Sequence, residues 1–189
     1  MGIRAFVACS CDGQTSTELT LLAEELRARV EGAVRLPPPQ SHHATIAFFP
    51  ALSADELAAI STSLEDCRGR GAIEYVLTEP KLLYRARGSS VVYCDVQESA
   101  GVLTSLQETV RRALAQSNAE SSVRYPRQAH VTVARTKRVS RETLRSALRQ
   151  VGRSGKESGE IRKFDRLELI RSTLTPTGPQ YESELSIDL

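Results

Sequence analysis

The sequence predicts an α+β fold built from two similar lobes. Segments typical of helices and of strands follow one another without the strict alternation of a doubly wound parallel sheet. Two short segments, separated by nearly half the chain, share the pattern His-x-Thr-apolar-Ala, which indicates a duplicated architecture. A chain of 189 residues suits one domain, and we expect that domain to span residues 1–189.

Capping and helix-breaking residues delimit the elements of the first half. Gly32 ends a helix whose apolar residues recur on one face, and Pro37–Pro39 excludes a helix just before the next strand. Ser53 and Glu56 have the spacing of a capping box, which begins the second helix. The expected elements are a strand at 3–9, a helix at 16–31, a strand at 43–49, a helix at 53–68, and strands or a hairpin at 72–78 and 81–85.

The second half is delimited in the same way. Ser140 caps a helix that carries Glu142 in its first turn, and a turn containing Pro176, Gly178 and Pro179 separates the last two strands. The expected elements are a strand at 90–96, a helix at 99–116, a polar linker at 117–122, a strand at 129–135, a helix at 141–151, a loop at 152–159, and strands at 164–173 and 180–188.

Composition excludes several classes of function. The formal net charge of +2 is too small for binding long duplex nucleic acid by charge alone. No apolar run approaches the roughly 20 residues of a membrane-spanning helix, and the apolar N-terminal stretch is too short for a signal sequence, so we expect a cytoplasmic protein without a membrane partner. The four cysteines lack zinc-site spacing. We therefore expect no metal, and we expect Cys9 and Cys94 to be buried thiols.

Two of the three histidines begin the repeated motif. Side chains two positions apart in a strand share a face, so His43 lies on the same face as Thr45, and His130 on the same face as Thr132. If the two strands lie side by side about a pseudo-twofold axis, these four polar side chains converge on one cleft. The copies read His43-Ala44-Thr45-Ile46-Ala47 and His130-Val131-Thr132-Val133-Ala134.

Two imidazoles and two hydroxyls suit phosphoryl chemistry without a metal. One neutral imidazole can deprotonate water while one imidazolium protonates the leaving oxygen, because an unperturbed pKa of about 6.5 makes both forms accessible at neutral pH. The hydroxyls can donate hydrogen bonds to phosphate oxygens. A single His-x-Thr is usually just a strand with one polar face, but two matched copies favour a functional site. The third histidine, His42, falls on the opposite face, and we expect it at the surface or at a loop end.

In these features the chain resembles the 2H phosphoesterase superfamily, which is named for two such motifs. Within it, the sequence is most similar to the RNA 2′,3′-cyclic phosphodiesterases, also called 2′–5′ RNA ligase-like proteins. The similar segments are an opening strand RAFVA, the proline-containing lead into the first motif, the second motif HVTVAR, and the stretch from Ser172 to Tyr181. The resemblance implies a bilobal pseudo-twofold fold in which two antiparallel sheets line a central cleft and helices lie outside.

The resemblance also implies an activity and the residues that carry it. Proteins of this kind hydrolyse 2′,3′-cyclic phosphates of RNA 3′ ends or nucleotides to 2′-phosphates, without metal or cofactor. By motif position, His43 corresponds to the general acid toward the 3′ oxygen and His130 to the general base for water. Thr45 and Thr132 correspond to phosphate-binding hydroxyls, and Arg135 to an arginine that contacts phosphate. The sequence does not fix the oligomeric state, for which a monomer is the expectation.

Some positions leave alternatives open. Arg135 follows His130 at an odd spacing, so it faces the cleft only if the strand ends or bulges, and otherwise merely flanks it. Many relatives carry a basic residue four positions after the first histidine and a glycine soon afterwards, where this chain has Ala47 and Pro50. The first lobe is therefore expected to bind RNA less strongly or to bind another ligand. A pseudo-symmetric site also allows either histidine to be the acid.

Basic residues gather around the second motif. Such a cluster is either a cationic rim whose aromatic member stacks on a base, or an ordinary solvated surface. Besides Arg135, the cluster consists of Arg124, Arg127, Lys137 and Arg138, with Tyr125 among them.

Three functions compete with hydrolysis of RNA cyclic phosphates. The first is a phosphodiesterase of the same superfamily that acts on another small cyclic phosphate, on 2′–5′ oligonucleotides, or as a 3′ RNA-trimming nuclease. The second is a module that binds nucleotides without turnover. The third is that the motifs are coincidental, in which case His43 and His130 should lie far apart.

Overall fold

The computed structural model describes residues 2–31, 33–38, 41–85, 89–116, 123–151, 159–176 and 178–189. The elements are β1 (Ile3–Ser10), α1 (Gly13–Arg29), β2 (Ala33–Arg35), β3 (His43–Leu52), α2 (Ala54–Glu65), β4 (Ile73–Leu77), β5 (Lys81–Tyr84), β6 (Ser89–Gln97), α3 (Val102–Gln116), β7 (His130–Lys137), α4 (Arg141–Val151), β8 (Arg162–Phe164), β9 (Arg166–Thr175) and β10 (Gly178–Asp188).

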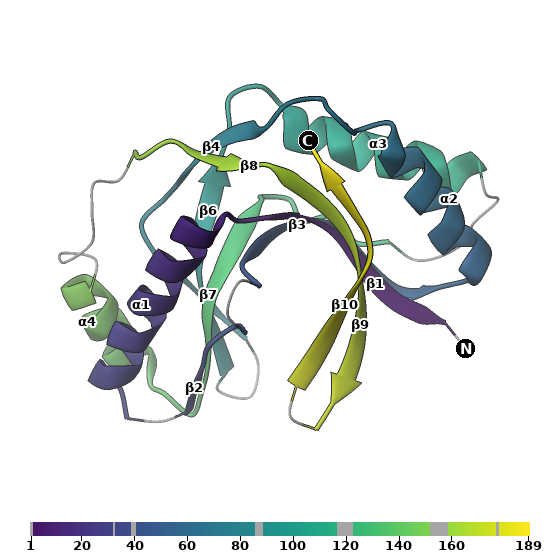
Figure 1. Cartoon of the computed structure of the whole chain (residues 1–189). Coiled ribbons are helices and arrows are strands. Elements are labelled where there is room, and N and C mark those ends of the chain that lie inside the picture. Colours follow the sequence, from purple (N-terminus) through teal and green to yellow (C-terminus); the bar gives the residue numbers. More distant parts are fainter. Residues whose placement is uncertain are drawn as a thin grey trace.

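The strands form a curled antiparallel sheet whose outer face is covered by the helices (Figure 1). The strand order is β10-β9-β1-β3-β7-β6-β4-β8, with β2 beside β7 and β5 beside β6. The two halves of the sheet are joined between β3 and β7 by the single pair Ala44–Val131. The predicted α+β fold is confirmed, and the two expected sheets are the two arms of one curled sheet.

The two halves repeat the same order of elements and exchange helices. The series β1-α1-β3-α2 corresponds to β6-α3-β7-α4, and the pairs β1–β3 and β6–β7 are both antiparallel. Helix α1 packs against α4 and β7 of the second half, whereas α3 packs against α2 and β3 of the first half (Figure 1). Each arm of the sheet is therefore covered partly by a helix from the other half.

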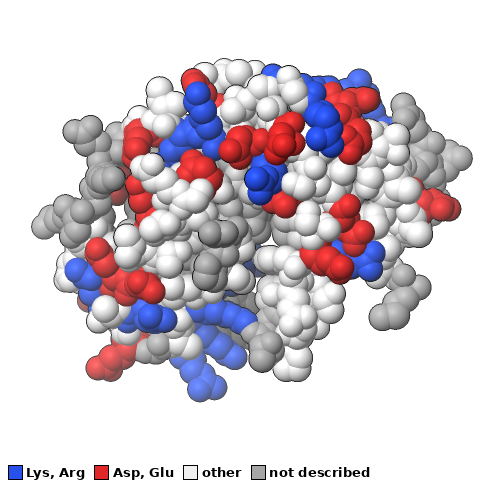
Figure 2. Space-filling view, viewed as in Figure 1, with Lys and Arg blue, Asp and Glu red and all other residues white. Residues whose placement is uncertain are grey.

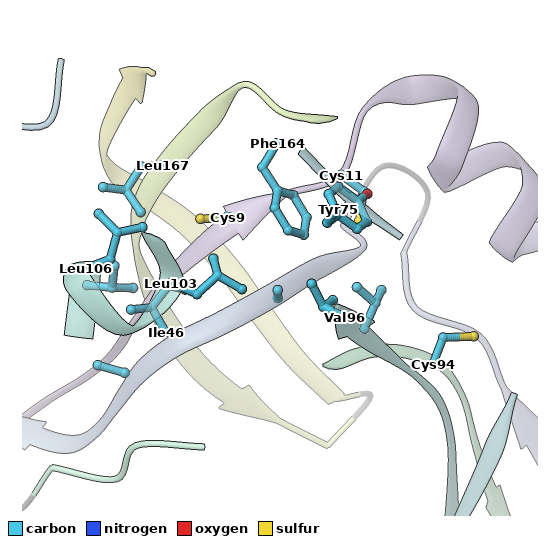
Figure 3. Packing of buried hydrophobic residues seen from close by; sticks show 14 of the residues in the cluster. Cys9, Cys11, Ile46, Tyr75, Cys94, Val96, Leu103, Leu106, Phe164 and Leu167 are labelled. Carbon is cyan, nitrogen blue, oxygen red and sulfur yellow. The ribbon is translucent and has the colours of Figure 1, made fainter. Parts of the chain in front are cut away.

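A single large apolar core lies between the helices and the sheet (Figure 3). Tyr75 and Phe164 stack within it, with ring centroids 3.8 Å apart. Cys9 and Cys94 belong to this core, so the expectation that they are buried thiols is confirmed. A smaller cluster lies on the concave face of β1 and β9, where Phe48 packs against it.

The predicted N-terminal caps at Ser53 and Ser140 are present, and one further cap moves a boundary, whereas Gly32, expected to end the first helix, lies outside the described residues. The capping box of Ser53 and Glu56 begins α2, and the Ser140 hydroxyl accepts a hydrogen bond from the third residue of α4. Helix α1 begins at Gly13, before the predicted position, because the Asp12 carboxylate accepts a hydrogen bond from the Thr15 amide at 2.6 Å.

The strands differ from the prediction in two places, and one alternative that the sequence left open is resolved. The short strand β2 was not predicted, and the strand expected at 164–173 is divided into β8 and β9. The strands expected at 72–78 and 81–85 exist as β4 and β5, and both pair with β6 rather than forming a hairpin. The expected linker at 117–122 and residues 152–158 of the expected loop lie outside the described residues.

Candidate active site

A cavity of about 460 Å³ opens on the concave face of the sheet, and both motifs line it. The side chains of His43, Thr45, His130 and Thr132 all border this cavity. The antiparallel register of the one β3–β7 pair places each histidine across from the threonine of the other motif. The structure therefore brings together the four residues that strand alternation predicted on one face, and the two histidines do not lie far apart.

A β-bulge follows the threonine in both motifs. Ile46 is the extra residue of β3 opposite β1, and Val133 is the extra residue of β7 opposite β6. One inserted residue reverses the alternation of faces, so Arg135 also borders the cavity. The bulge fulfils the condition under which Arg135 was expected to face the cleft. The same position of the first motif is occupied by Phe48.

Backbone carbonyls orient both imidazoles in the same way. The Nδ1 atom of His43 lies 2.7 Å from the carbonyl oxygen of Ser41, and that of His130 lies 3.1 Å from the carbonyl oxygen of Gln128. Because a carbonyl only accepts, each Nδ1 carries the proton, and each Nε2 remains available for proton transfer. The amide and hydroxyl of Ser41 in turn donate to the carbonyl of Pro38, which fixes this part of the proline-rich lead.

Aromatic side chains flank the two histidines differently. His43 stacks on Phe6 at a centroid distance of 4.9 Å and meets the edge of Tyr181 at 6.1 Å. His130 meets the edge of Tyr93 at 5.4 Å. Tyr181, which the sequence could not place, lies in the cavity wall.

The environment of His43 lowers its pKa. Burial is the main cause, and the positive charge of Arg135 and the neighbouring His130 act in the same direction. The hydrogen bond to Ser41 and the carboxylate of Glu168 oppose this shift. In the ligand-free protein, His43 is therefore held toward its neutral form.

Each motif has a carboxylate nearby, but the two are held differently. Beside the first motif, Ser10 and Ser183 donate hydrogen bonds to Glu168. Beside the second motif, the Lys81 ammonium donates a hydrogen bond to the Asp95 carboxylate and forms an ion pair with it, with an N–O distance of 2.5 Å. One carboxylate is thus held by neutral hydroxyls and the other by a cation.

A second arginine borders the cavity beside the expected one. Arg35 of β2 pairs directly with Arg135 of β7. Burial lowers the pKa of Arg135; Tyr181 opposes this shift, and the positive charges of Arg85, Arg35 and Arg4 add to it. None of these four arginines forms an ion pair with a carboxylate among the residues that the structure describes. Sequence reasoning missed Arg35 because three residues of β2 carry too weak a strand signal.

The expected cationic rim has a different composition. Its other members, Arg124, Arg127, Lys137 and Arg138, are outside the cavity lining. Tyr125 does not reach the cavity either, because it packs against the core and under the guanidinium of Arg111, which lies 4.2 Å from its ring centroid.

His42 lies at the loop end directly before β3, which is one of the two expected positions, but its burial corrects the other expectation, a place at the surface. His42 is only 1% exposed, and neither ring nitrogen has a hydrogen-bond partner among the residues that the structure describes. Burial, with a smaller contribution from the neighbouring His43, lowers its pKa to about 4. Strand alternation correctly placed His42 opposite His43, but that opposite face is the protein interior.

Metal-binding clusters and membrane-spanning helices are both absent from the described ranges. There, no group of three or more histidine, cysteine, aspartate or glutamate side chains is arranged to hold a metal ion. No helix in the same part of the chain is both long and apolar enough to cross a membrane.

No protein-family model and no curated protein matches the sequence, whereas several solved structures match the fold. TT0787 of Thermus thermophilus superposes with a TM-score of 0.72 at 19% identity, covering 98% of this chain and 97% of that chain. E. coli LigT complexed with 3′-AMP gives 0.68 at 18% identity over 100% and 99% of the two chains. The PDE domain of MHV ns2 gives 0.55 at 15% identity over 89% and 99%. The chain therefore has the fold of LigT and of the MHV ns2 PDE domain, as its resemblance to the 2H phosphoesterases implies.

Proposed function

We propose that the protein hydrolyses the 2′,3′-cyclic phosphate of RNA 3′ ends or of nucleotides to a 2′-phosphate, without a metal. The observation that carries the proposal is the pair of imidazoles whose Nε2 atoms are available beside two threonine hydroxyls in one cavity. Solved structures of LigT contain 3′-AMP, ATP and NADP+, and another similar structure is that of a phosphoesterase. These likenesses support a nucleotide phosphodiester as the substrate.

In the proposed reaction the two histidines act on opposite ends of one displacement. Nε2 of neutral His130 takes a proton from water as the water oxygen bonds to phosphorus. The bond between phosphorus and O3′ breaks, and Nε2 of protonated His43 donates its proton to O3′. Thr45, Thr132 and Arg135 donate hydrogen bonds to the non-bridging oxygens as negative charge builds on them. The products are a 2′-phosphate and a free 3′-hydroxyl.

The lowered pKa of His43 sets a condition on this direction. His43 must be protonated to act as the acid, yet its surroundings favour the neutral form. The negative charge of a bound phosphate raises the pKa of an adjacent imidazole. Substrate binding therefore favours the protonated form of His43 that the reaction requires. If His130 were the acid instead, the same residues would run the reaction with the roles exchanged.

The direct test is hydrolysis of the four nucleoside 2′,3′-cyclic phosphates and of an oligonucleotide with a cyclic-phosphate end, all with EDTA present. We expect turnover and exclusively 2′-phosphate products, identified by phosphorus NMR. Formation of 3′-phosphates, or loss of activity with EDTA, contradicts the mechanism. Nucleotide binding in calorimetry without hydrolysis over hours would instead indicate a binding module. We further expect a cytoplasmic monomer, which size-exclusion chromatography and cell fractionation test.

A further inference from the structure

The cavity has one cationic wall and one uncharged wall. Arg35 and Arg135, from β2 and β7, form the cationic wall. Pro179 and Tyr181, from β10, form the uncharged wall, and Tyr181 is 40% exposed. Figure 2 shows lysine and arginine side chains gathered beside the uncharged projection that β9 and β10 make. A nucleotide presents the same two chemistries, since it carries charge on its phosphates and an apolar face on its base.

The cationic wall holds more charge than the proposed reaction needs. A cyclic phosphodiester carries one negative charge, which Arg135 can meet. Arg35 lies directly opposite Arg135 in the register, where paired Cα atoms are about 4.5–5.5 Å apart. The positive charge of Arg35 acts unfavourably on that of Arg135. Within the described part of the chain, no carboxylate forms an ion pair with either arginine. A second anion bound between or beside them would relieve this repulsion.

The other arm of the sheet provides an internal comparison. There Arg124 pairs with Phe48, through backbone hydrogen bonds of 2.8 and 2.9 Å, as Arg35 pairs with Arg135. Arg124 thus has the same place in the repeated architecture as Arg35. It lies outside the cavity lining, however, and its strand partner is aromatic. Of the two equivalent positions, only the one beside β7 thus pairs two arginines that both border the cavity.

We propose that Arg35, together with Arg135, binds a second phosphate of the substrate, namely the 5′-phosphate of the nucleotide whose cyclic phosphate is hydrolysed. This inference rests on the proposed function and narrows its substrate class. Each internucleotide linkage of an RNA strand carries such a charge, so RNA ends are preferred over nucleoside 2′,3′-cyclic phosphates. With both phosphates on the cationic wall, the base lies toward Tyr181, which offers a stacking surface.

The kinetic test compares two substrates that differ only in the second phosphate: adenosine 2′,3′-cyclic phosphate and its 5′-phosphorylated form. We expect wild-type protein to show kcat/KM at least 10-fold higher for the 5′-phosphorylated form, with a preference that declines as salt is raised. Arg35→Gln should reduce this ratio about 10-fold or more. Arg124→Gln removes the same charge from the equivalent position of the other arm and should leave the ratio unchanged.

A binding test separates this inference from the proposed function. Calorimetry with adenosine 2′-phosphate and adenosine 2′,5′-bisphosphate requires no turnover. We expect the bisphosphate to bind at least 10-fold more tightly, and Arg35→Gln to abolish that difference. Equal affinities, or an equal loss for both ligands in Arg35→Gln, overturn the second-phosphate site even if hydrolysis occurs. Failure to hydrolyse either cyclic phosphate overturns the proposed function, while an intact bisphosphate preference would retain the site.

Discussion

The two motif strands, β3 and β7, have the same backbone but different chemistry at the fifth residue after the histidine. Each orients its histidine through a carbonyl two residues earlier, and each has a bulge after its threonine. The bulge brings Arg135 into the cavity from β7, whereas β3 carries Phe48. Phe48 packs with the small apolar cluster on β1 and β9, and the Arg4 guanidinium lies 4.7 Å from its ring centroid. The repeat thus preserves the orientation of both histidines, while at the fifth residue only β7 places an arginine in the cavity.

The side chains around the two histidines also differ between the two arms. His43 is stacked on Phe6, and the carboxylate that acts on it, Glu168, accepts hydrogen bonds from hydroxyls. His130 lies beside a carboxylate that Lys81 already pairs with. A pseudo-symmetric backbone therefore does not make the two histidines interchangeable. Matched variants of the two halves can show in which properties the halves differ.

The largest expected effect is the loss of turnover when the histidine of either motif is replaced. Replacing His43 or His130 by Ala should lower kcat by roughly 10²–10⁴-fold, because each removes one proton-transfer group. Circular dichroism and thermal unfolding should show an intact fold. Wild-type turnover of a 2′,3′-cyclic phosphate by either variant would exclude the two-histidine mechanism.

A 3′-thio analogue of the cyclic phosphate distinguishes the roles of the two histidines. A thiolate leaves without being protonated, so loss of the acid matters much less with this substrate. We expect the His43→Ala variant to recover most of its activity on the analogue and the His130→Ala variant to remain slow. The reverse result would assign the acid to His130.

The exchange of helices predicts that the two halves unfold together. Helix α1 packs against the second half and α3 against the first half, and each contributes a buried leucine, Leu26 and Leu106. Leu26→Ala and Leu106→Ala should each lower the free energy of unfolding by about 2–5 kcal/mol. Hydrogen exchange measured on peptides of β3 and β7 should show the same loss of protection in both variants. Destabilisation confined to one half would show two independent domains.

His42 and His43 are neighbours in sequence but face the interior and the cavity respectively, so they should respond differently to pH. The pKa of His42 is about 4 in the folded protein and 6.5 in the reference state. The unfolded chain therefore takes up this proton first as the pH falls. The contribution of His42 to stability is complete above about pH 6.5, declines between pH 6.5 and 4, and amounts to roughly 3 kcal/mol.

The His42→Leu variant isolates this effect. Because neither nitrogen of His42 has a hydrogen-bond partner in the described part of the chain, an apolar replacement leaves no described polar group unsatisfied. Stability at pH 7 should therefore be unchanged or higher. Urea unfolding of the variant between pH 7 and pH 4 should show a smaller loss of stability than wild type. An equal loss in both proteins would exclude His42 as the source.

The sequence predicted the site to the extent that local rules determine it. Alternation along a strand was sufficient for the two His-Thr pairs, and capping chemistry was sufficient for the start of α2. Arg135 required a bulge, which depends on packing against the neighbouring strand. The position of Arg35 could not be predicted from the sequence, because β2 is short and is defined by its pairing with β7. The burial of His42 was not predicted, because alternation gives the relative faces of neighbouring residues and not which face is buried.

The smallest expected effect tests whether the fifth residue after each histidine makes the two arms different. Arg135→Gln removes a charged hydrogen-bond donor to the phosphate, which should lower kcat/KM about 10–100-fold. Phe48→Leu occupies the equivalent position on β3 but changes only packing with the apolar cluster and Arg4, so we expect less than about a threefold change. Both variants are measured on one cyclic phosphate, with kcat and KM determined separately. A comparable loss in Phe48→Leu would mean that the fifth residue after the histidine contributes to activity in both arms, and that the two arms do not differ at this position.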